Sequence, residues 1–211
     1  MNTSESENRS AADTDSVSYY ENRNNTEAFI RQTAAADMSD VLGRFLSRLA
    51  PGAFILELGC GSGRDALQMK NAGFRIRATD GSKEMAFQAQ KRLGLPVEVL
   101  RFDDLQETDQ YDGIYACACL LHVPYEDLPD IFSRIKKALK PGGIFYCSFK
   151  YGNSEREKDG RFFCDLDEKR MKKILAFCPS LSIAEQWISG DVRAGRKKEK
   201  WLNTILIRQP D

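Results

Sequence analysis

The sequence has very little histidine and no excess of charge of either sign. His122 is its one histidine, and the six cysteines among the 211 residues include no CxxC pair. Because zinc sites need closely spaced cysteine and histidine ligands, this pattern predicts that the chain holds no metal. The 31 basic residues balance 31 acidic residues. Composition therefore gives no reason to expect a nucleic-acid partner.

Long apolar runs are missing as well. No uninterrupted apolar segment approaches the roughly 18 to 20 residues that span a bilayer. The first residues, MNTSESENRSAADTDS, have neither the basic segment nor the apolar core of an export signal. These absences predict a cytoplasmic chain without membrane contact, whose cysteines are reduced and mostly buried. Residues 1–17 offer almost nothing to bury, so we expect a disordered tail there.

The rest of the sequence, residues 18–211, has the length of one domain. Apolar residues at three- and four-residue spacing predict two helices in residues 18–50. Residues 53–150 then alternate between strand-like and helix-like patterns. This alternation predicts an α/β fold with right-handed crossovers and a mostly parallel sheet that has helices on both faces. The expected strands are 53–58, 74–79, 97–102, 112–118 and 144–149, and the expected helices between them are 64–72, 82–93 and 128–139.

Residues 151–211 follow a different pattern. Two strand-like runs, 181–188 and 201–208, are joined by the polar and basic loop GDVRAGRKKEK with no helix between them. This arrangement predicts an antiparallel hairpin that closes one edge of the sheet. The basic loop itself is explained most simply as a solvated surface.

The most informative stretch is ILELGCGSG, residues 55–63, an apolar run followed by glycines at alternate positions. A strand, a glycine turn and a helix start bring backbone close to a nucleotide-like ligand, because glycine lacks a β-carbon and the helix start offers free N–H groups. A dinucleotide fingerprint needs a small residue at the sixth position of GxGxxG, where this chain has Arg64. The stretch is instead ExGxGxG, with Glu57 two residues before Gly59.

In this form the stretch resembles motif I of the class I S-adenosylmethionine-dependent methyltransferases. The resemblance continues, in the family's order, through Asp80, FDDL at 102–105, YDGI at 111–114 and LKPGG at 139–143. It implies a Rossmann-like fold with a seven-stranded sheet and an enzyme that uses S-adenosylmethionine. The segments GCGSGRDA and LLHVP look most like the small stand-alone enzymes grouped with the tellurite-resistance and ubiquinone-pathway methyltransferases.

The resemblance also implies a set of cofactor-binding residues. Asp80 would accept both ribose hydroxyls, as an acidic residue about 20 positions past the glycine turn does in nucleotide folds. A helix cap or an Asx turn is the other interpretation of this residue. Asp103 is the favoured partner of the adenine amino group, with Asp104 as the alternative. The full set is Glu57, Gly59, Cys60, Gly61, Gly63, Arg64, Asp80, Gly81, Ser82, Met85, Phe102, Asp103, Asp104, Ala116 and Cys117.

The loops after the fourth and fifth strands are expected to meet the methyl acceptor. His122 follows the fourth strand and is the candidate general base, because an imidazole titrates near neutral pH. A loop histidine that only orders the turn is the alternative. The candidate acceptor-binding residues are Tyr19, Tyr20, His122, Lys150, Tyr151 and Arg161. Among them, the two cations would grip a carboxylate, a phosphate or an oxyanion.

We therefore predict an S-adenosylmethionine-dependent methyltransferase that acts on a small molecule, with an anionic one favoured by these cations. Two alternatives stay open. The basic loops suggest an RNA or tRNA base methyltransferase, and the chain would also suit a protein that binds S-adenosylmethionine without turnover. Nothing in the sequence decides between a monomer and a homodimer.

Overall fold

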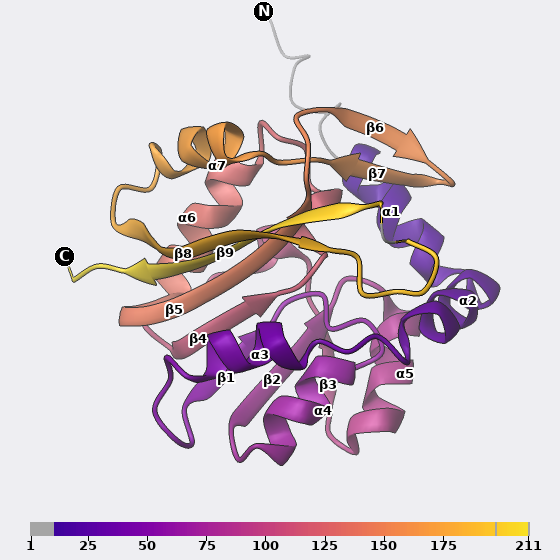
Figure 1. Ribbon diagram of the computed structural model, residues 1–211. Coiled ribbons are helices and arrows are strands. Elements are labelled where there is room, and N and C mark those ends of the chain that lie inside the picture. The colour runs from indigo at the N-terminus through magenta and orange to yellow at the C-terminus, as the bar shows by residue number, and fades with distance from the viewer. Residues whose placement is uncertain (1–10, 197, 211) are drawn as a thin grey trace, which may run out of the picture.

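The computed structural model describes residues 11–196 and 198–210, and at its centre is a twisted seven-stranded sheet (Figure 1). The strand order is β3-β2-β1-β4-β5-β9-β8. These strands are β1 (Phe54–Glu57), β2 (Arg75–Asp80), β3 (Val97–Val99), β4 (Tyr111–Ala116), β5 (Leu139–Lys150), β8 (Leu181–Gly190) and β9 (Lys200–Arg208). The first five pair in parallel, whereas β9 runs antiparallel to both β5 and β8. The predicted sheet and its terminal hairpin are confirmed.

Seven helices accompany the sheet in the described part of the chain. They are α1 (Ala11–Glu21), α2 (Arg23–Thr33), α3 (Ser39–Leu46), α4 (Arg64–Asn71), α5 (Lys83–Leu93), α6 (Leu128–Ala138) and α7 (Glu168–Leu175). Buried side chains of α6 and α7 pack against one face of the sheet, and those of α3 and α4 pack against the other. The prediction of helices on both faces is therefore confirmed.

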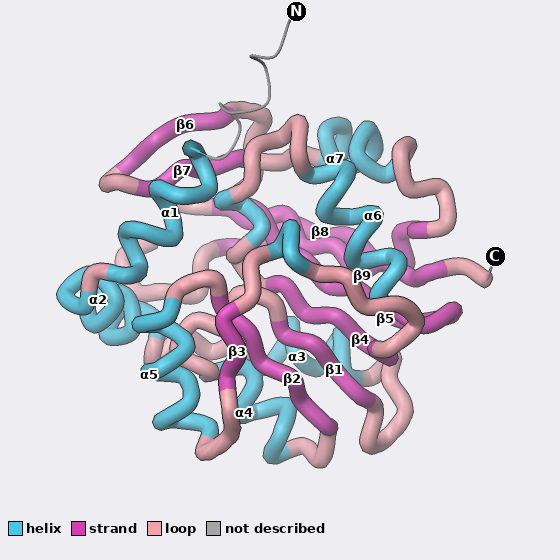
Figure 2. The backbone as a smooth tube through the Cα atoms, turned by 180° about the vertical axis from the view of Figure 1, so that it is seen from behind, coloured by secondary structure: helices cyan, strands magenta, loops and turns pink. Residues whose placement is uncertain are grey.

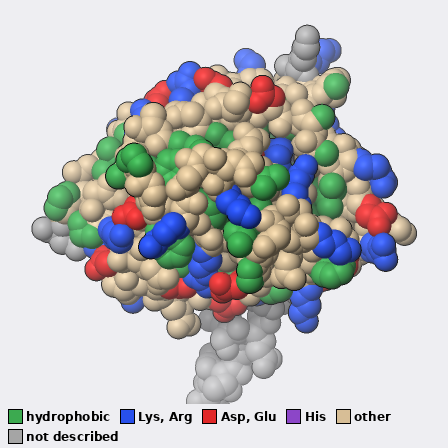
Figure 3. Space-filling view, turned by 90° about the horizontal axis from the view of Figure 1, so that it is seen from below, with side chains coloured by type: hydrophobic (Ala, Val, Ile, Leu, Met, Phe, Trp, Pro, Cys, Tyr) green, Lys and Arg blue, Asp and Glu red, His purple; other side chains and the backbone are tan. Residues whose placement is uncertain are grey.

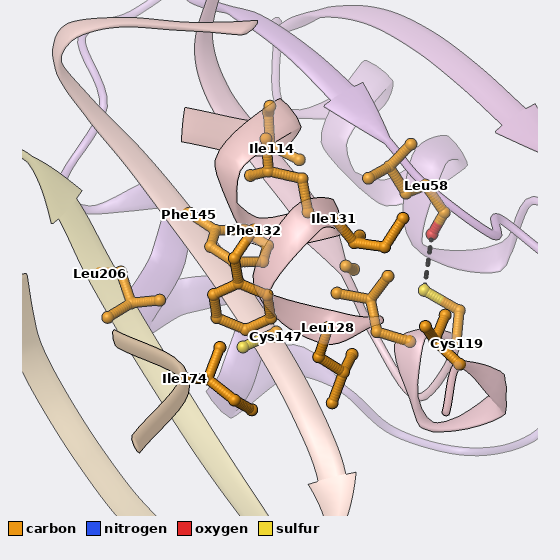
Figure 4. Close-up of a cluster of buried hydrophobic side chains, with 14 of the residues drawn as sticks. Leu58, Ile114, Cys119, Leu128, Ile131, Phe132, Phe145, Cys147, Ile174 and Leu206 are labelled. Atoms are coloured by element: carbon orange, nitrogen blue, oxygen red, sulfur yellow. Dashed lines mark hydrogen bonds between the residues drawn. The ribbon is translucent and has the colours of Figure 1, made fainter. Parts of the chain in front are cut away.

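The two faces come from the alternation of side chains along each strand. In β4, Ile114 joins the buried cluster that contains Phe132 and Phe145, which Figure 4 shows in close contact. The next residue, Tyr115, points to the other face, where its ring packs on Phe45 and stacks on Tyr146. Because both faces of the strand are apolar, the sheet is covered on both sides and its ligand site has to lie at an end of the strands.

The structure differs from the sequence predictions at the amino-terminal end. Helix α1 begins at Ala11, so the expected end of a disordered tail at residue 17 falls within this helix; the rest of that tail, residues 1–10, lies outside the described residues. The first of the two predicted helices is divided at Asn22, whose side chain accepts hydrogen bonds from the backbone N–H groups of Asn24 and Asn25 and caps α2. Local capping thus overrides a continuous helical pattern.

A second difference lies between β5 and β8. There the chain forms a two-stranded sheet, β6 (Glu155–Lys158) with β7 (Arg161–Cys164), followed by α7, where no element was predicted. In Figures 1 and 2 the β6–β7 hairpin lies apart from the main sheet, with β7 beside α1. The backbone N–H of Phe162 donates to the Ser16 hydroxyl at 3.1 Å. The hairpin and α1 are therefore joined near the carboxyl ends of the parallel strands.

The region after β3 is the third difference. The expected strand 97–102 ends at Val99, and Phe102–Asp104 forms a turn of 3₁₀ helix, η1. A second such turn, η2 (Leu120–His122), follows β4. Strand β5 begins at Leu139, earlier than expected, because Leu139 already pairs with Tyr111 before a shift in register. Both 3₁₀ turns follow the carboxyl ends of their strands, where ligands of parallel sheets bind.

Candidate functional site

Two joined cavities, of about 210 Å³ and about 80 Å³, lie beside the glycine-rich turn. The larger cavity extends to the β6–β7 hairpin and the β8–β9 loop, and the smaller one extends to the end of β2 and to η1. The residues that line both are Tyr20, Phe29, Gly59, Gly61, Ala118 and His122. A ligand at this junction would therefore contact the turn, helices α1 and α2, and the loop after β4 together.

The glycines of the turn serve different purposes. Gly59 has a φ of +61°, and a β-carbon on it would lie 2.4 Å from the Cys119 β-carbon. On Gly63 the β-carbon would approach Leu93 of α5 at 3.0 Å. Gly61 lines both cavities, and its β-carbon would meet only the Phe29 ring, at 3.6 Å. Close packing of the protein thus requires glycine at two positions that the sequence argument attributed to ligand approach.

Asp80 is a structural anchor of the turn as well as a wall of the smaller cavity. Its Oδ2 accepts a hydrogen bond from the Gly61 backbone N–H at 2.9 Å, and its Oδ1 accepts one from the Ser82 N–H at 3.0 Å. Burial raises the pKa of this carboxyl to about 6, against the lowering effect of these two hydrogen bonds. The cap of α5 is Ser82, whose hydroxyl accepts from the Met85 N–H at 3.1 Å. The helix-cap interpretation therefore belongs to Ser82, and Asp80 forms the Asx turn.

Most residues predicted around adenosine do line the smaller cavity. They are Asp80, Gly81, Ser82, Met85 and Phe102, and the wall also includes Val17, Leu100 and Arg101. Asp103 and Asp104 are exposed and are not among the lining residues. The Asp103 carboxylate instead lies 3.5 Å from the Arg101 guanidinium. The choice between the two aspartates for the adenine amino group stays a prediction.

Near the glycine turn, the larger cavity is bounded by charged groups. The Arg64 guanidinium forms two hydrogen bonds to the Asp65 carboxylate, at 2.6 and 2.8 Å, and donates to the Thr33 carbonyl at 3.2 Å. The Glu57 side chain is buried beside this pair, and its Oε2 has no hydrogen-bond partner in the described structure. Burial and the nearby Asp65 carboxylate raise the pKa of Glu57 well above its usual value. This wall suits a ligand that carries both an ammonium and a carboxylate group.

At the end of β4, the residues that line the cavities differ in part from the predicted ones. Cys60 and Cys117 line the larger cavity, as expected of cofactor-binding residues. Ala116 is wholly buried in the core, and Ala118 lines both cavities instead. Burial raises the pKa of the Cys117 thiol to about 12, so this group stays protonated near neutral pH.

His122 lies at the junction of the two cavities. Its Nδ1 is 2.7 Å from the Phe162 carbonyl oxygen, which makes Nδ1 the protonated nitrogen and leaves Nε2 as the basic one. Burial lowers the pKa of this imidazole to about 4, so the ring is neutral near pH 7. Its ring packs edge-on against Tyr20, with centroids 5.9 Å apart, and lies 5.2 Å from the Phe163 ring. Both the catalytic and the structural interpretations are compatible with this geometry.

Of the other predicted acceptor residues, the structure brings Tyr20, Lys150 and Arg161 together on the larger cavity. Arg161 donates to the Tyr20 hydroxyl at 3.3 Å and lies over the Tyr19 ring, 4.6 Å from its centroid. Tyr19 thus supports Arg161 without lining the cavity. Tyr151 is also outside the lining, because its hydroxyl donates to Glu168 of α7 at 3.1 Å. The prediction that Tyr151 contacts the acceptor is not supported by this geometry.

Sequence reasoning missed part of the acceptor side. Arg193 and Arg196, in the loop interpreted as a solvated surface, line the larger cavity, and so do Lys158 and Asp159. Arg193 is held by Asp191, whose carboxylate also accepts from the Trp201 indole N–H at 3.1 Å. Asp191, two residues before Arg193 in the sequence, was a local signal that could have predicted an ordered arginine. Lys158 and Asp159 carried none, because the hairpin that places them was not predicted.

Within residues 11–196 and 198–210, no three histidine, cysteine, aspartate or glutamate side chains are grouped closely enough to hold a metal ion. None of the helices in that part of the chain combines the length and the apolar character that crossing a bilayer requires.

Comparison with known proteins finds methyltransferases among the matches. A family model described as "Methyltransferase domain" matches residues 55–143. The chain is 31% identical over 124 residues to phosphoethanolamine N-methyltransferase 2 of Caenorhabditis elegans, covering 53% of this chain and 27% of that protein. It is also 31% identical over 135 residues to O-methyltransferase resE of Aspergillus sclerotiorum, covering 60% and 49%. The chain therefore spans less than half the length of these two relatives.

Solved structures share the fold over nearly the whole chain. The 1,6-didemethyltoxoflavin-N1-methyltransferase of Burkholderia thailandensis, crystallised with S-adenosylhomocysteine, has a TM-score of 0.76 and 20% identity, covering 100% of this chain and 93% of that one. The magnesium protoporphyrin IX methyltransferase of Synechocystis PCC 6803, also with S-adenosylhomocysteine, has a TM-score of 0.75 and 16% identity, covering 94% and 100%. Residues 55–143 thus match a methyltransferase-domain model, and the chain shares the sheet order and fold of these solved methyltransferases.

Proposed function

We propose that this protein transfers a methyl group from S-adenosylmethionine to a small anionic molecule. The observation that carries the proposal is the pair of cavities joined at the glycine turn and His122. One cavity has the wall expected for adenosine. The other is lined on its far side by cations from three segments of the chain: β5, the β6–β7 hairpin and the β8–β9 loop. Donor and acceptor would thus meet at the residues that both cavities share.

The donor half of the site fits the charges of S-adenosylmethionine. Asp80 would accept from the ribose hydroxyls, with Met85 and Phe102 beside the base. Arg64 would meet the carboxylate of the methionine part, and the unpartnered Glu57 oxygen would meet its ammonium. Glu57 is buried and Asp80 is partly buried, and the pKa values of both carboxyls are raised. Donor groups from the ligand would therefore supply the stabilisation that the protein leaves incomplete.

When bound, S-adenosylmethionine supplies a methyl group that is already activated on a sulfonium. The protein then mainly has to align the acceptor, exclude water and take up a proton where the nucleophile carries one. His122 is in a suitable form for the last of these tasks, because its neutral ring keeps Nδ1 on the Phe162 carbonyl and leaves Nε2 free to accept a proton. In this role His122 is a general base, and the hydrogen bond from Nδ1 fixes its orientation.

The preference for an anion rests on Arg161. Its Nε is buried without a hydrogen-bond partner, and no carboxylate of the described chain lies within ion-pair distance of its guanidinium. An unpaired guanidinium on a cavity wall favours a ligand that brings a carboxylate or phosphate, since guanidinium binds such groups with charge-assisted hydrogen bonds.

A small acceptor fits the basic loop better than RNA does. Arg193 and Arg196 line the larger cavity and pair with Asp191 and Glu199. On the face of the molecule seen in Figure 3, basic and acidic side chains are interspersed. Membership of the tellurite-resistance and ubiquinone-pathway group is supported only by the segments GCGSGRDA and LLHVP, and a cytoplasmic location only by the composition. Both remain predictions.

The test is transfer of a radiolabelled methyl group from S-adenosylmethionine into a metabolite extract and, in parallel, into a bulk RNA fraction. We expect label in anionic small molecules and none in RNA. Label confined to RNA would replace the proposal with the nucleic-acid alternative. Cofactor binding without label in either fraction would favour a protein that binds S-adenosylmethionine without turnover.

A further inference from the structure

The acceptor side of the larger cavity carries more positive charge than one anionic group needs. Among the described residues, five cations line this side and three carboxylates face or pair with them, which leaves an excess of two positive charges. The cations are Lys150, Lys158, Arg161, Arg193 and Arg196, and the carboxylates are Asp159, Asp191 and Glu199.

The pairing of these groups shows where the excess lies. Arg193 is bound by Asp191, and Glu199 is shared between Lys150, at 2.6 Å, and Arg196, at 3.6 Å. In the described structure neither Lys158 nor Arg161 has a carboxylate within ion-pair distance. Because Glu199 serves two cations, one of the two excess charges stays with Lys150 and Arg196. The other lies on the β6–β7 hairpin, where Asp159 stands in the turn between Lys158 and Arg161.

Lys158 and Arg161 are direct register partners across that hairpin. Side chains at such positions are about 5 Å apart at their β-carbons, and like charges directly opposite one another destabilise a strand pair. Both side chains nevertheless line the same cavity, with Arg161 fixed by the Tyr20 hydroxyl and the Tyr19 ring. Two like charges held at this spacing match a ligand group that bears two negative charges and several acceptor oxygens.

We infer that Lys158 and Arg161 form a subsite for a doubly charged anion, and that the methyl acceptor carries a phosphate monoester. This inference rests on the proposed function, whose anionic acceptor it narrows from any anion to a dianion. Asp159, in the turn between the two cations, lines the same cavity and offsets one of their charges. The second excess charge that a dianion would meet lies on the same cavity wall, with Lys150 and Arg196.

The test compares two probes of nearly the same shape, phenyl phosphate and phenyl sulfate, by calorimetry on the full chain saturated with S-adenosylhomocysteine. Phenyl sulfate has one negative charge at every pH used, whereas a phosphate monoester gains its second charge near pH 6. At pH 8 we expect phenyl phosphate to bind at least about tenfold more tightly, because an added charge-assisted contact is worth about that factor. At pH 5 the two affinities should converge.

Two variants locate the effect. Lys158→Gln should abolish the preference for phosphate at pH 8, and Lys172→Gln, on the exposed surface of α7, should leave it unchanged. The inference is overturned if the two probes bind equally at pH 8, if neither binds, or if Lys158→Gln keeps the preference. Failure of S-adenosylhomocysteine to bind in the first step would instead count against the proposed function, so the two failures are distinguishable.

Discussion

The Oδ2 atom of Asp80 accepts a hydrogen bond from the backbone N–H of Gly61 at 2.9 Å. This contact ties the end of β2 to the turn that follows β1. The same carboxylate holds Ser82 at the start of α5, so one partly buried side chain fixes the two backbone segments that border the smaller cavity. Substitution of Asp80 is therefore expected to weaken cofactor binding more than acceptor binding.

Replacing Asp80 should weaken cofactor binding in a graded way. Asp80→Asn keeps the shape and one acceptor oxygen, and we expect S-adenosylhomocysteine to bind about tenfold more weakly, since a hydrogen bond to a charged group contributes about 1.5 to 3 kcal/mol. Asp80→Ala should lose calorimetrically detectable binding. Circular dichroism of each variant controls for unfolding, and unchanged affinity in Asp80→Ala would refute the ribose assignment.

Cofactor binding should also release protons near pH 6. Burial raises the pKa of Asp80 to about 6 in the free protein, and hydroxyl donors on a ligand would favour its charged form. Affinity should thus rise between pH 5 and pH 7, with release of about half a proton per ligand at pH 6. Calorimetry in two buffers of different ionisation enthalpy measures this release. Glu57 should add to the proton release, because its pKa is also raised. The part of the release that is lost in the Asp80→Asn variant is the contribution of Asp80.

The same pKa has a consequence for stability without ligand. A carboxyl whose folded-state pKa is raised stabilises the fold most below its unfolded value, 3.8, and this contribution is lost as the pH rises through about 6. His122 acts in the opposite pH direction, since its pKa is lowered from 6.5 to about 4 and its contribution is lost as the pH falls through that value. The two groups therefore favour stability at opposite ends of the range between pH 4 and pH 6.5.

The donor side of the site could be predicted from the sequence because its residues lie in short local motifs. The turn at 55–63, Asp80 and the start of α5 each carry a spacing that local backbone geometry requires. Phe102, which lines the smaller cavity, also lies in such a motif. The predicted contact of Asp103 with adenine could not be derived in this way. Strand β3 ends at Val99 and the chain turns at η1, so both aspartates are exposed.

The acceptor side was harder to predict because segments distant in sequence form it. The strands EREK and RFFC have only four residues each, and every residue of the first is charged. The contacts that hold the second are long-range, from Phe162 to Ser16 and to His122. Tyr151 was expected at the site because α7, which supplies its hydrogen-bond partner Glu168, had not been predicted. Arg193 looked like part of a solvated loop until Asp191 was placed beside it.

The distinction between glycines predicts a difference in stability. Gly59 and Gly94 both have a φ of +61°, but only Gly59 has atoms within 4 Å of its missing β-carbon, the nearest being the Cys119 β-carbon at 2.4 Å. Gly94→Ala should cost about 1 kcal/mol of strain. Gly59→Ala should add an overpacking cost of about 1 to 3 kcal/mol. Denaturant unfolding of both variants measures the difference, and equal midpoints would show that Cys119 moves aside freely.

Two variants of His122 can separate a catalytic role of this residue from a structural one. In His122→Asn the amide nitrogen lies near the position of Nδ1 and can still donate to the Phe162 carbonyl, while the basic nitrogen is lost. If His122 is the general base, kcat should fall by about 10² to 10⁴ with S-adenosylhomocysteine affinity unchanged. In His122→Gln the carbonyl loses its close donor, so the fold should be destabilised by about 1 to 3 kcal/mol. Near-normal kcat in a stably folded His122→Asn protein would leave His122 with the structural role alone, as the link between the loop after β4 and the β6–β7 hairpin.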